Sequence, residues 1–256
     1  MDTQQKEKIS YIKEYVIAAG YVIFFCLAFA LCIIIYYFTY LQPQPSPINA
    51  FATGLPPTTP TPHINPTNLQ NASLIFKDDF SNDRHAWTDT EDDSQERVSY
   101  GTLIFESRKE NAYAFANCGS CPYLDAPFYL QADLLPGIAT DKGFGIYFNF
   151  NSNDNGSFFL FRINTEARKY YVYHVTNDGW TIRAAGESDQ IKSFPAGNTL
   201  GIYARKDVVE FYINGKIIDS YKQSGYSFHK GDFGFYIDNS GFKLLVDNLE
   251  INKIGN

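Results

Sequence analysis

The chain has few basic residues, and none of them is clustered. Its 256 residues carry 21 Lys and Arg against 28 Asp and Glu, which gives a formal net charge of −7. A surface that binds DNA or RNA needs grouped Lys and Arg to neutralise phosphates. We therefore exclude nucleic acid as a partner.

Charge is absent altogether from Val16 to Phe38. At 1.5 Å rise per residue a helix of this length reaches about 35 Å, enough to cross a hydrocarbon core of about 30 Å. The run predicts a transmembrane helix over residues 15–40 behind a short tail, residues 1–14. The rival interpretation is a cleaved signal peptide, because Ala50-Phe51-Ala52 has the small-x-small form of a cleavage site. Against it, the run is longer than a signal-peptide core and ends well before that site.

Lysine is unevenly distributed around the uncharged run. Lys6, Lys8 and Lys13 precede it, whereas no Lys or Arg follows it before Lys77. Basic residues stay on the cytoplasmic side of a membrane helix. We therefore expect a single-pass protein of the cell membrane, with a cytoplasmic N-terminus and everything after Tyr40 exported.

Residues 42–70 hold eight of the twelve prolines and almost no charge. Such a segment cannot bury a core and favours extended polyproline II, which would reach up to roughly 90 Å at about 3.1 Å per residue. Residues 41–72 are therefore predicted to form a stalk.

Helical periodicity is missing after the stalk, where short apolar or alternating runs are broken by turn residues. In one run the apolar positions are Phe144, Ile146, Phe148 and Phe150, and they alternate with Gly145, Tyr147, Asn149 and Asn151. This alternation is typical of a strand with one apolar and one mixed face. Ten or more strands at this spacing predict that residues 73–256 form an all-β, antiparallel two-sheet jelly-roll sandwich.

Turn sequences separate several of the expected strands. Asn153–Gly156 precedes a strand at Ser157–Asn164, and Asn177–Gly179 separates Tyr170–Val175 from Trp180–Ala184. Asn214-Gly215 separates Val208–Ile213 from Lys216–Ile218. Because an Asn-Gly pair readily takes the positive φ angles of a two-residue hairpin, the last turn is the strongest signal.

These signals occur in an order that resembles concanavalin A-like lectin and glucanase domains. The residues that carry the resemblance are Asp78-Asp79-Phe80, Gly143–Phe148, Tyr170-Tyr171, Asp178-Gly179-Trp180, Tyr212–Gly215, Gly231–Phe235 and Val246-Asp247-Asn248. The chain looks most similar to a bacterial branch with 3-keto-disaccharide hydrolase-like and laminin G-like domains. That branch often has Phe-Arg after the Gly-x-Gly strand, where this chain has Phe148-Asn149. The resemblance implies a jelly roll, and its motifs are specific for fold rather than for activity.

The resemblance also suggests a structural calcium ion where the first and last strands meet. Asp79 and Asp247 occupy the matching positions, with Asp78 as a further candidate, and carboxylate oxygens suit calcium. The competing interpretation is that Asp78-Asp79 merely begins a strand. No other cofactor is expected.

Some members of this fold hydrolyse glycans with carboxylates on one strand. Glu91, Asp93 and Glu96 match a glucanase-like spacing, yet the surrounding segment, TDTEDDSQER, has no apolar residue. A glycosidase needs a buried acid with a raised pKa and a partner held about 5 to 10 Å away. We expect a solvated acidic loop here and no catalytic residue.

Cys118 and Cys121 are the two cysteines that follow the membrane run. A zinc site would need further ligands, but His63, His85, His174 and His229 are scattered. A redox C-x-x-C would begin a helix in a thioredoxin-like fold, which the strand pattern does not indicate. In an exported domain we favour a structural disulfide between Cys118 and Cys121.

Most of the 22 Phe and 19 Tyr are expected to fill the core. A sugar ring has apolar C–H faces and a rim of hydroxyls, so flat aromatics beside Asn and Arg donors would suit it. The candidate ligand-binding residues of this kind are Tyr147, Asn149, Asn151, Arg162, Tyr171, Tyr173 and Trp180.

Three functions follow from these patterns. The first is a membrane-anchored, non-catalytic module that binds a glycan or another cell-envelope ligand. The second is a structural or protein-interaction subunit, which could also contact another membrane protein through its helix. The third and weakest is a glycan-processing enzyme. An open aromatic and polar face would favour the first, whereas an exposed apolar patch would favour the second.

Overall fold

The structure is a computed structural model that describes residues 71–87, 89–90, 94–110, 112–151, 156–222, 228, 230–238 and 241–255. The expected tail and membrane helix, and all but the last two residues of the expected stalk, lie outside these ranges. Within them, no helix has the length and apolar character needed to cross a membrane.

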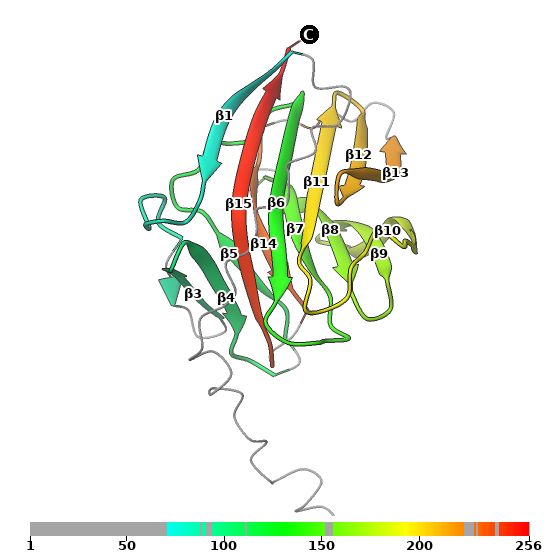
Figure 1. The fold of residues 1–256 in the computed structure, drawn as a ribbon. Helices are drawn as coiled ribbons and strands as arrows, with labels where there is room; N and C mark the ends of the chain where they lie inside the picture. The colour runs from blue at the N-terminus through cyan, green and yellow to red at the C-terminus, as the bar shows by residue number, and fades with distance from the viewer. Residues whose placement is uncertain are drawn as a thin grey trace, which may run out of the picture. The chain divides into compact units, whose positions relative to one another are not determined.

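The described residues form fifteen strands (Figure 1). They are β1 (Ala72–Asp78), β2 (Asp89–Thr90), β3 (Ser94–Ser99), β4 (Thr102–Ser107), β5 (Ala114–Asn117), β6 (Phe128–Pro136), β7 (Phe144–Asn151), β8 (Ser157–Asn164), β9 (Lys169–Thr176), β10 (Gly179–Glu187), β11 (Asn198–Arg205), β12 (Val208–Ile213), β13 (Lys216–Lys222), β14 (Asp232–Ile237) and β15 (Lys243–Ile254).

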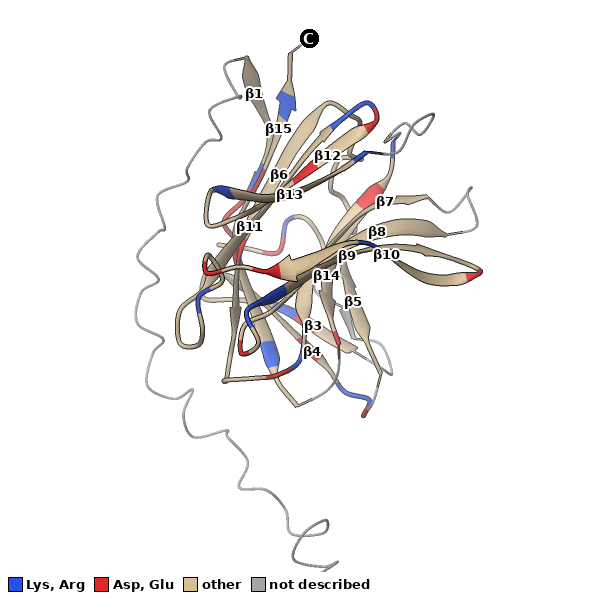
Figure 2. Cartoon of the chain, turned by 90° about the vertical axis from the view of Figure 1, so that its right-hand side faces the viewer, with Lys and Arg blue, Asp and Glu red and all other residues tan. Residues whose placement is uncertain are grey.

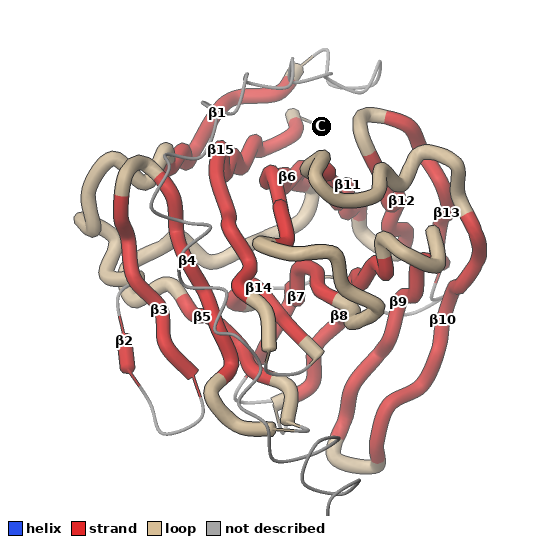
Figure 3. Tube along the Cα trace, turned by 60° about the horizontal axis from the view of Figure 1, so that its bottom comes forward, coloured by secondary structure: helices blue, strands red, loops and turns tan. Residues whose placement is uncertain are grey.

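Two antiparallel sheets contain all of these strands. The nine-stranded sheet has the order β13-β12-β11-β6-β15-β4-β3-β2, and β1 also pairs with β15. The six-stranded sheet has the order β10-β9-β8-β7-β14-β5. Figure 3 shows β9 and β10 on one side of this second sheet and β5 on the other. The all-β, antiparallel two-sheet prediction is confirmed for the described part of the chain.

One large apolar core lies between the two sheets. The six-stranded sheet contributes Phe144, Ile146 and Phe148 of β7, and the nine-stranded sheet contributes residues such as Leu130 and Ile202, all with 0% exposure. Each side chain of this kind stabilises the fold by about 1.5–3 kcal/mol when it is fully buried. The alternation read from β7 therefore identifies the core face of this strand up to Phe148.

The hairpin signals also agree with the structure. Asn214 and Gly215 have φ angles of 50° and 76°, and they join β12 to β13 with Ile213 paired to Lys216. Two successive positive φ angles are typical of the type I′ hairpin turn. Strands β8 and β12 begin and end at the predicted residues.

The expected alternation fails at the end of β7, because a β-bulge interrupts it. Asn149 has a φ angle of 58°, and the register with β8 shifts between Phe148 and Asn151. An extra residue in one strand reverses the facing of the residues that follow it. Phe150 consequently packs against Phe158 on the opposite side of the sheet from Phe148, and Asn151 faces away from Phe150.

The acidic segment before Arg97 is also more ordered than expected. Ser94–Ser99 forms β3 and pairs with β4, while residues 91–93 lie outside the described ranges. Glu96 is only 3% exposed. The expectation of a wholly solvated loop was wrong for Glu96, because pairing with β4 gives this polar segment a buried side that its own composition does not indicate.

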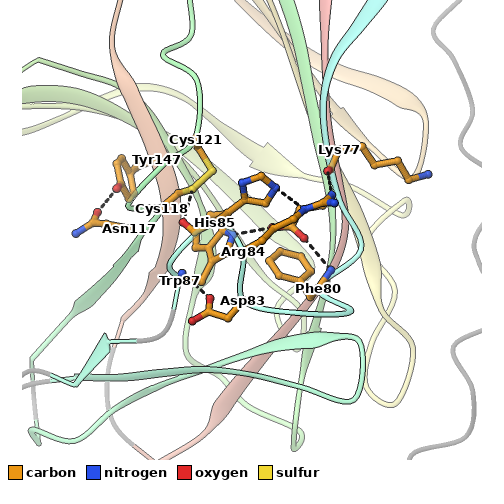
Figure 4. Close-up of a disulfide and its surroundings, with 11 residues drawn as sticks. Lys77, Phe80, Asp83, Arg84, His85, Trp87, Asn117, Cys118, Cys121 and Tyr147 are labelled. Carbon is orange, nitrogen blue, oxygen red and sulfur yellow. Dashed lines mark hydrogen bonds between the residues drawn. A yellow bond between two sulfur atoms is a disulfide. The ribbon is translucent and has the colours of Figure 1, made fainter.

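The predicted disulfide between Cys118 and Cys121 is present, directly after β5 (Figure 4). The turn that it closes is held against the segment before Trp87. There the amide of Gly119 donates to the carbonyl of Ala86 over 3.1 Å, and that of Ser120 donates to the carbonyl of His85 over 3.2 Å. The disulfide therefore fixes the end of β5.

Replacing both cysteines with serine should lower the free energy of unfolding by no more than roughly 2 kcal/mol, because a cross-link over so short a loop restricts the unfolded chain only slightly. Urea unfolding of the double variant Cys118→Ser/Cys121→Ser, compared with the unreduced parent chain, measures this. Complete alkylation of both thiols in the parent chain without reductant would contradict the disulfide itself.

Candidate ligand-binding face

The six-stranded sheet carries a second layer of aromatic residues on the side that faces away from the core. We call this surface the aromatic face. Its buried members are Tyr147, Phe158, Leu160, Val175 and Tyr236, and Phe115, Phe150 and Tyr173 pack against them. The rings meet mostly edge to face, as between Phe115 and Tyr147, whose centroids are 5.4 Å apart. Such pairs add about 0.5–1.5 kcal/mol beyond their buried area.

The aromatic face is concave. Tyr113 directly precedes β5 at one edge of the sheet, and Trp180 lies on β10 at the other edge, yet their ring centroids are 5.4 Å apart. Six strands at a spacing of about 4.8 Å would place the edges of a flat sheet about 24 Å apart. The sheet must therefore curl until side chains from its two edges touch over its middle.

The most exposed rings of this face lie where the two edges meet. Trp180 is 39% exposed and Tyr113 is 53% exposed, and Trp180 also contacts Tyr173 and Tyr236. The rings beneath them fill the concavity. A ligand would consequently meet a shallow aromatic surface rather than a deep cleft.

The structure places all seven predicted ligand-binding residues on four neighbouring strands, β7 to β10, but not in equivalent positions. Tyr147 and Asn149 are 4% and 5% exposed, so they offer almost no surface to a ligand. Tyr171 and Tyr173 of β9 are partly exposed and stack with a centroid distance of 5.9 Å. Of the seven, the rings available to a ligand are therefore Tyr171 and Tyr173 of β9 and Trp180 of β10.

Arg162 makes one end of the aromatic face polar. Its guanidinium donates a hydrogen bond to Asp238, donates a longer one to the Tyr173 hydroxyl, and lies 5.3 Å from the centroid of the Tyr171 ring. Desolvation lowers the pKa of Arg162, but the Asp238 carboxylate more than offsets it, so that the pKa is raised. The pair is a fixed, overall neutral group beside aromatic rings.

Gly143 allows this ion pair to form. Its amide donates to the Asp238 carboxylate over 2.7 Å. A Cβ atom at this position would lie 1.9 Å from Nε of Arg162, which is far inside van der Waals contact. A glycine is therefore required where the guanidinium crosses the backbone before β7.

The centre of the face is held by a second polar contact. The Tyr147 hydroxyl donates to the side-chain carbonyl of Asn117, the last residue of β5 (Figure 4). Burial raises the pKa of Tyr147, and the negative charge of Asp232 adds to the shift. Burial likewise raises the pKa of Asp232 itself.

Carboxylates are sparse on this sheet. Among the described residues its strands carry Asp232 and Glu187, and Asp238 follows β14 directly. Asp232 and Asp238 are separated by the length of β14, about 20 Å at 3.3 Å per residue. The carboxylates of a glycosidase lie about 5 to 10 Å apart. Glu96 is not a substitute, because β3 belongs to the other sheet.

Each aspartate proposed to bind calcium accepts a hydrogen bond from a residue close to it in the sequence. Asp79 accepts a hydrogen bond from the Ser81 amide, and Asp247 accepts one from the Asn248 amide. Asp78 is buried and accepts from the Phe80 amide and from Nε1 of Trp87. No group of three or more His, Cys, Asp or Glu suited to a metal occurs within the described ranges. Calcium, which takes six to eight oxygens, would need backbone carbonyls in addition to these carboxylates, and its binding here stays a prediction.

Several members of the aromatic face were not predicted as site residues, namely Tyr113, Phe115, Phe150, Phe158, Tyr236 and Asp238. Alternation along β14 would have placed Tyr236 and Asp238 on one side of that strand. No local pattern indicates that Tyr113 reaches Trp180, because this contact depends on the curl of the whole sheet.

Comparisons with known proteins identify the fold. No protein-family model and no curated protein sequence matches the chain. Among solved structures, a Bacillus subtilis protein with a galectin-like fold matches with a TM-score of 0.58 and 14% identity, over 73% of this chain and 99% of that one. An endo-β-1,3-glucanase from Pyrococcus furiosus matches with a TM-score of 0.55 and 13% identity, over 72% and 95%.

The catalytic domain of a laminarinase from Thermotoga maritima is similar as well, with a TM-score of 0.53 and 12% identity over 73% of this chain and 100% of that one. At such identities the similarity concerns the fold alone. The domain thus has the jelly-roll sandwich fold that these galectin-like and glucanase structures share.

Proposed function

We propose that this protein is a membrane-anchored module that recognises a glycan outside the cytoplasm and does not cleave it. The anchor is the uncharged helix over residues 15–40, the stalk is residues 41–72, and the jelly roll carries the binding surface. Within its fold it belongs to the membrane-anchored bacterial branch that its motifs resemble.

The observation that carries this proposal is the exposed aromatic surface at the mouth of the concave sheet. Trp180 and Tyr113 present ring surface, Tyr171 and Tyr173 extend it, and Arg162 with Asp238 supplies donors and acceptors at one end. Apolar ring faces beside fixed polar groups match the two kinds of surface on a sugar. Figure 2 shows that charged residues are scattered over the described strands and turns rather than gathered into one patch, which suits a neutral ligand.

The spacing of carboxylates supports binding without catalysis. Asp238 is engaged by Arg162, and Asp232 lies at the far end of β14. The two are about 20 Å apart along β14, well beyond the spacing of a glycosidase pair. This separation supports binding rather than hydrolysis at the aromatic face.

Replacing Trp180 with alanine should weaken glycan binding roughly 5- to 150-fold, the equivalent of about 1–3 kcal/mol, because the change removes the largest exposed ring of the face. A glycan array probed with the full-length chain would first identify a ligand. Titration of that ligand into the parent chain and the variant Trp180→Ala then measures the loss.

The matched control is Tyr100→Asn, which removes a fully exposed ring from the turn between β3 and β4 in the other sheet. Tyr100 has a φ angle of 54°, a conformation that asparagine tolerates. This control should leave both binding and melting temperature unchanged. Equal affinity of the parent chain and Trp180→Ala for the array ligand would exclude the aromatic face as its site.

The second candidate ligand is a protein, and the exposure of Ile182 favours it. This side chain is 55% exposed on β10, two residues from Trp180, and β10 is an edge strand. An aliphatic side chain beside an exposed ring on a free strand edge suits a protein surface better than a sugar. An array without any bound glycan would favour this alternative.

A further inference from the structure

A separate cavity lies at the end of the nine-stranded sheet, away from the aromatic face. It has a volume of about 390 Å³ and is lined by residues that include Pro127, Tyr203, Arg205, Lys206 and Ile254. These come from the segment before β6, the end of β11 with its following turn, and the end of β15. Pairing holds them together, since Ala204 lies opposite Phe128 and the Ile254 amide donates to the Pro127 carbonyl over 3.1 Å.

The three lining segments lie at one end of the sandwich, where β11 and β15 both finish (Figure 1). The cavity volume falls within the range of about 300–1,000 Å³ that is usual for small-molecule sites. Its walls combine apolar side chains, Pro127 and Ile254, with two cationic ones, Arg205 and Lys206. Such a combination suits a small ligand with an anionic end and an apolar body.

Arg205 and Lys206 differ in the contacts that their charged groups make. Arg205 donates a hydrogen bond to Glu210 and lies 5.0 Å from the centroid of the Tyr203 ring, which leaves further N–H donors of its guanidinium for another acceptor. The ammonium of Lys206 makes no hydrogen bond or ion pair with any residue that the structure describes. Among the described residues, the site therefore has a positive charge that no carboxylate pairs with, in a chain whose net charge is −7.

Turn geometry does not explain why a lysine occupies position 206. Lys206 and Asp207 join β11 to β12, with Arg205 paired to Val208, and Lys206 has a φ angle of 28°. Such turns favour Asn, Asp or Gly, as Asn214-Gly215 illustrates in the next hairpin. A residue that conflicts with its local backbone is expected where its side chain has a function.

We propose that this cavity binds a small carboxylate-bearing ligand. The carboxylate would lie between the Lys206 ammonium and the remaining donors of Arg205, and the body of the ligand would pack against Pro127 and Ile254. Guanidinium and ammonium groups bind carboxylates through short, charge-assisted hydrogen bonds. This site is independent of the proposed glycan site, because the aromatic face belongs to the other sheet.

Calorimetric titration of the full-length chain, purified in detergent, tests the proposal with three probes. D-Glucuronate has a carboxylate on a sugar body, benzoate has one on an apolar ring, and D-glucose is the neutral match of glucuronate. We expect at least one of the two acids to bind, with an affinity that falls as salt is added, and glucose not to bind. Which acid binds identifies the body that the cavity accepts.

The variant Lys206→Asn should weaken binding of that acid roughly tenfold or more, because it removes the unpaired charge. Asparagine tolerates the positive φ angle, so the melting temperature should stay the same or rise, which separates lost binding from lost folding. Lys206→Arg should retain binding. Lys216→Asn, at an exposed lysine in the next hairpin, is the matched control and should bind as the parent chain does.

Three results would each overturn the proposal. They are the absence of heat with both acids, binding of glucose as tight as that of the acid that binds, and equal affinity of the parent chain and Lys206→Asn for that acid.

Discussion

Replacing Tyr147 with alanine should lower the free energy of unfolding by about 3–5 kcal/mol, the usual cost of emptying a buried aromatic site. The ring is only 4% exposed, and it packs edge to face against Phe115 and Phe158 at centroid distances of 5.4 Å and 5.8 Å. Its hydroxyl also bonds to Asn117, which ties β7 to β5 across β14. The change would therefore loosen an edge strand as well as leave a cavity.

Urea unfolding of Tyr147→Ala measures this effect, with two further variants for comparison. Tyr147→Phe keeps the ring and loses only the hydroxyl contact, so it should cost about 1 kcal/mol. Trp180→Ala, at a ring that is 39% exposed, should cost less than Tyr147→Ala. If Tyr147→Ala unfolded like the parent chain and lost ligand binding instead, Tyr147 would be a surface contact, and the interpretation of the aromatic face as a packed layer would fail.

The features of the fold that the sequence predicts are those that depend on neighbours along the chain. Asn214-Gly215 has the residue types that a type I′ turn requires, and the structure has positive φ angles at both. The alternation from Phe144 to Phe148 likewise identifies a core face, because side chains of a strand alternate regardless of what they pack against.

Features that depend on distant parts of the chain were not predictable. The bulge at Asn149 moves Phe150 to the aromatic face, and no composition signal accompanies it. The contact of Arg162 with Asp238 joins residues 76 positions apart. Such contacts follow from the strand order, which places β14 beside β7 and β8 beside β7, and not from any local pattern.

The seven candidate residues lie on neighbouring strands of one sheet, as their sequence positions suggest, but they differ in how far they are exposed. Trp180, Tyr171 and Tyr173 lie with exposed or partly exposed rings on the aromatic face, whereas Tyr147 is packed beneath them. Exposure depends on the curl of the sheet, which brings Tyr113 and Trp180 together from its opposite edges. A sequence pattern gives the side of a strand but not what covers that side.

The stability of the domain should fall steeply above pH 10. Burial raises the pKa values of Tyr147 and Tyr236, and nearby aspartates add to both shifts. Burial also raises the pKa of Tyr129 in the other sheet. These hydroxyls keep their protons in the folded state, whereas tyrosines of the unfolded chain lose them near pH 10. The stabilisation is therefore complete below pH 10 and is lost as the pH rises above it.

Each tyrosine that stays protonated only in the folded state contributes a slope of about 1.4 kcal/mol per pH unit above pH 10. Because unfolded tyrosines are only half ionised at pH 10, the full slope is reached above it, and Tyr147 and Tyr236 together should remove about 2 kcal/mol between pH 10 and pH 11. Urea unfolding at pH 8, 9, 10 and 11 measures the slope. The variant Tyr147→Phe should make the slope smaller by the contribution of one tyrosine, about 1.4 kcal/mol per pH unit. Tyr100→Phe, at a fully exposed ring, should leave the slope unchanged. A free energy of unfolding that stays constant up to pH 11 would show that these hydroxyls are open to solvent, because only a buried hydroxyl resists ionisation in this range.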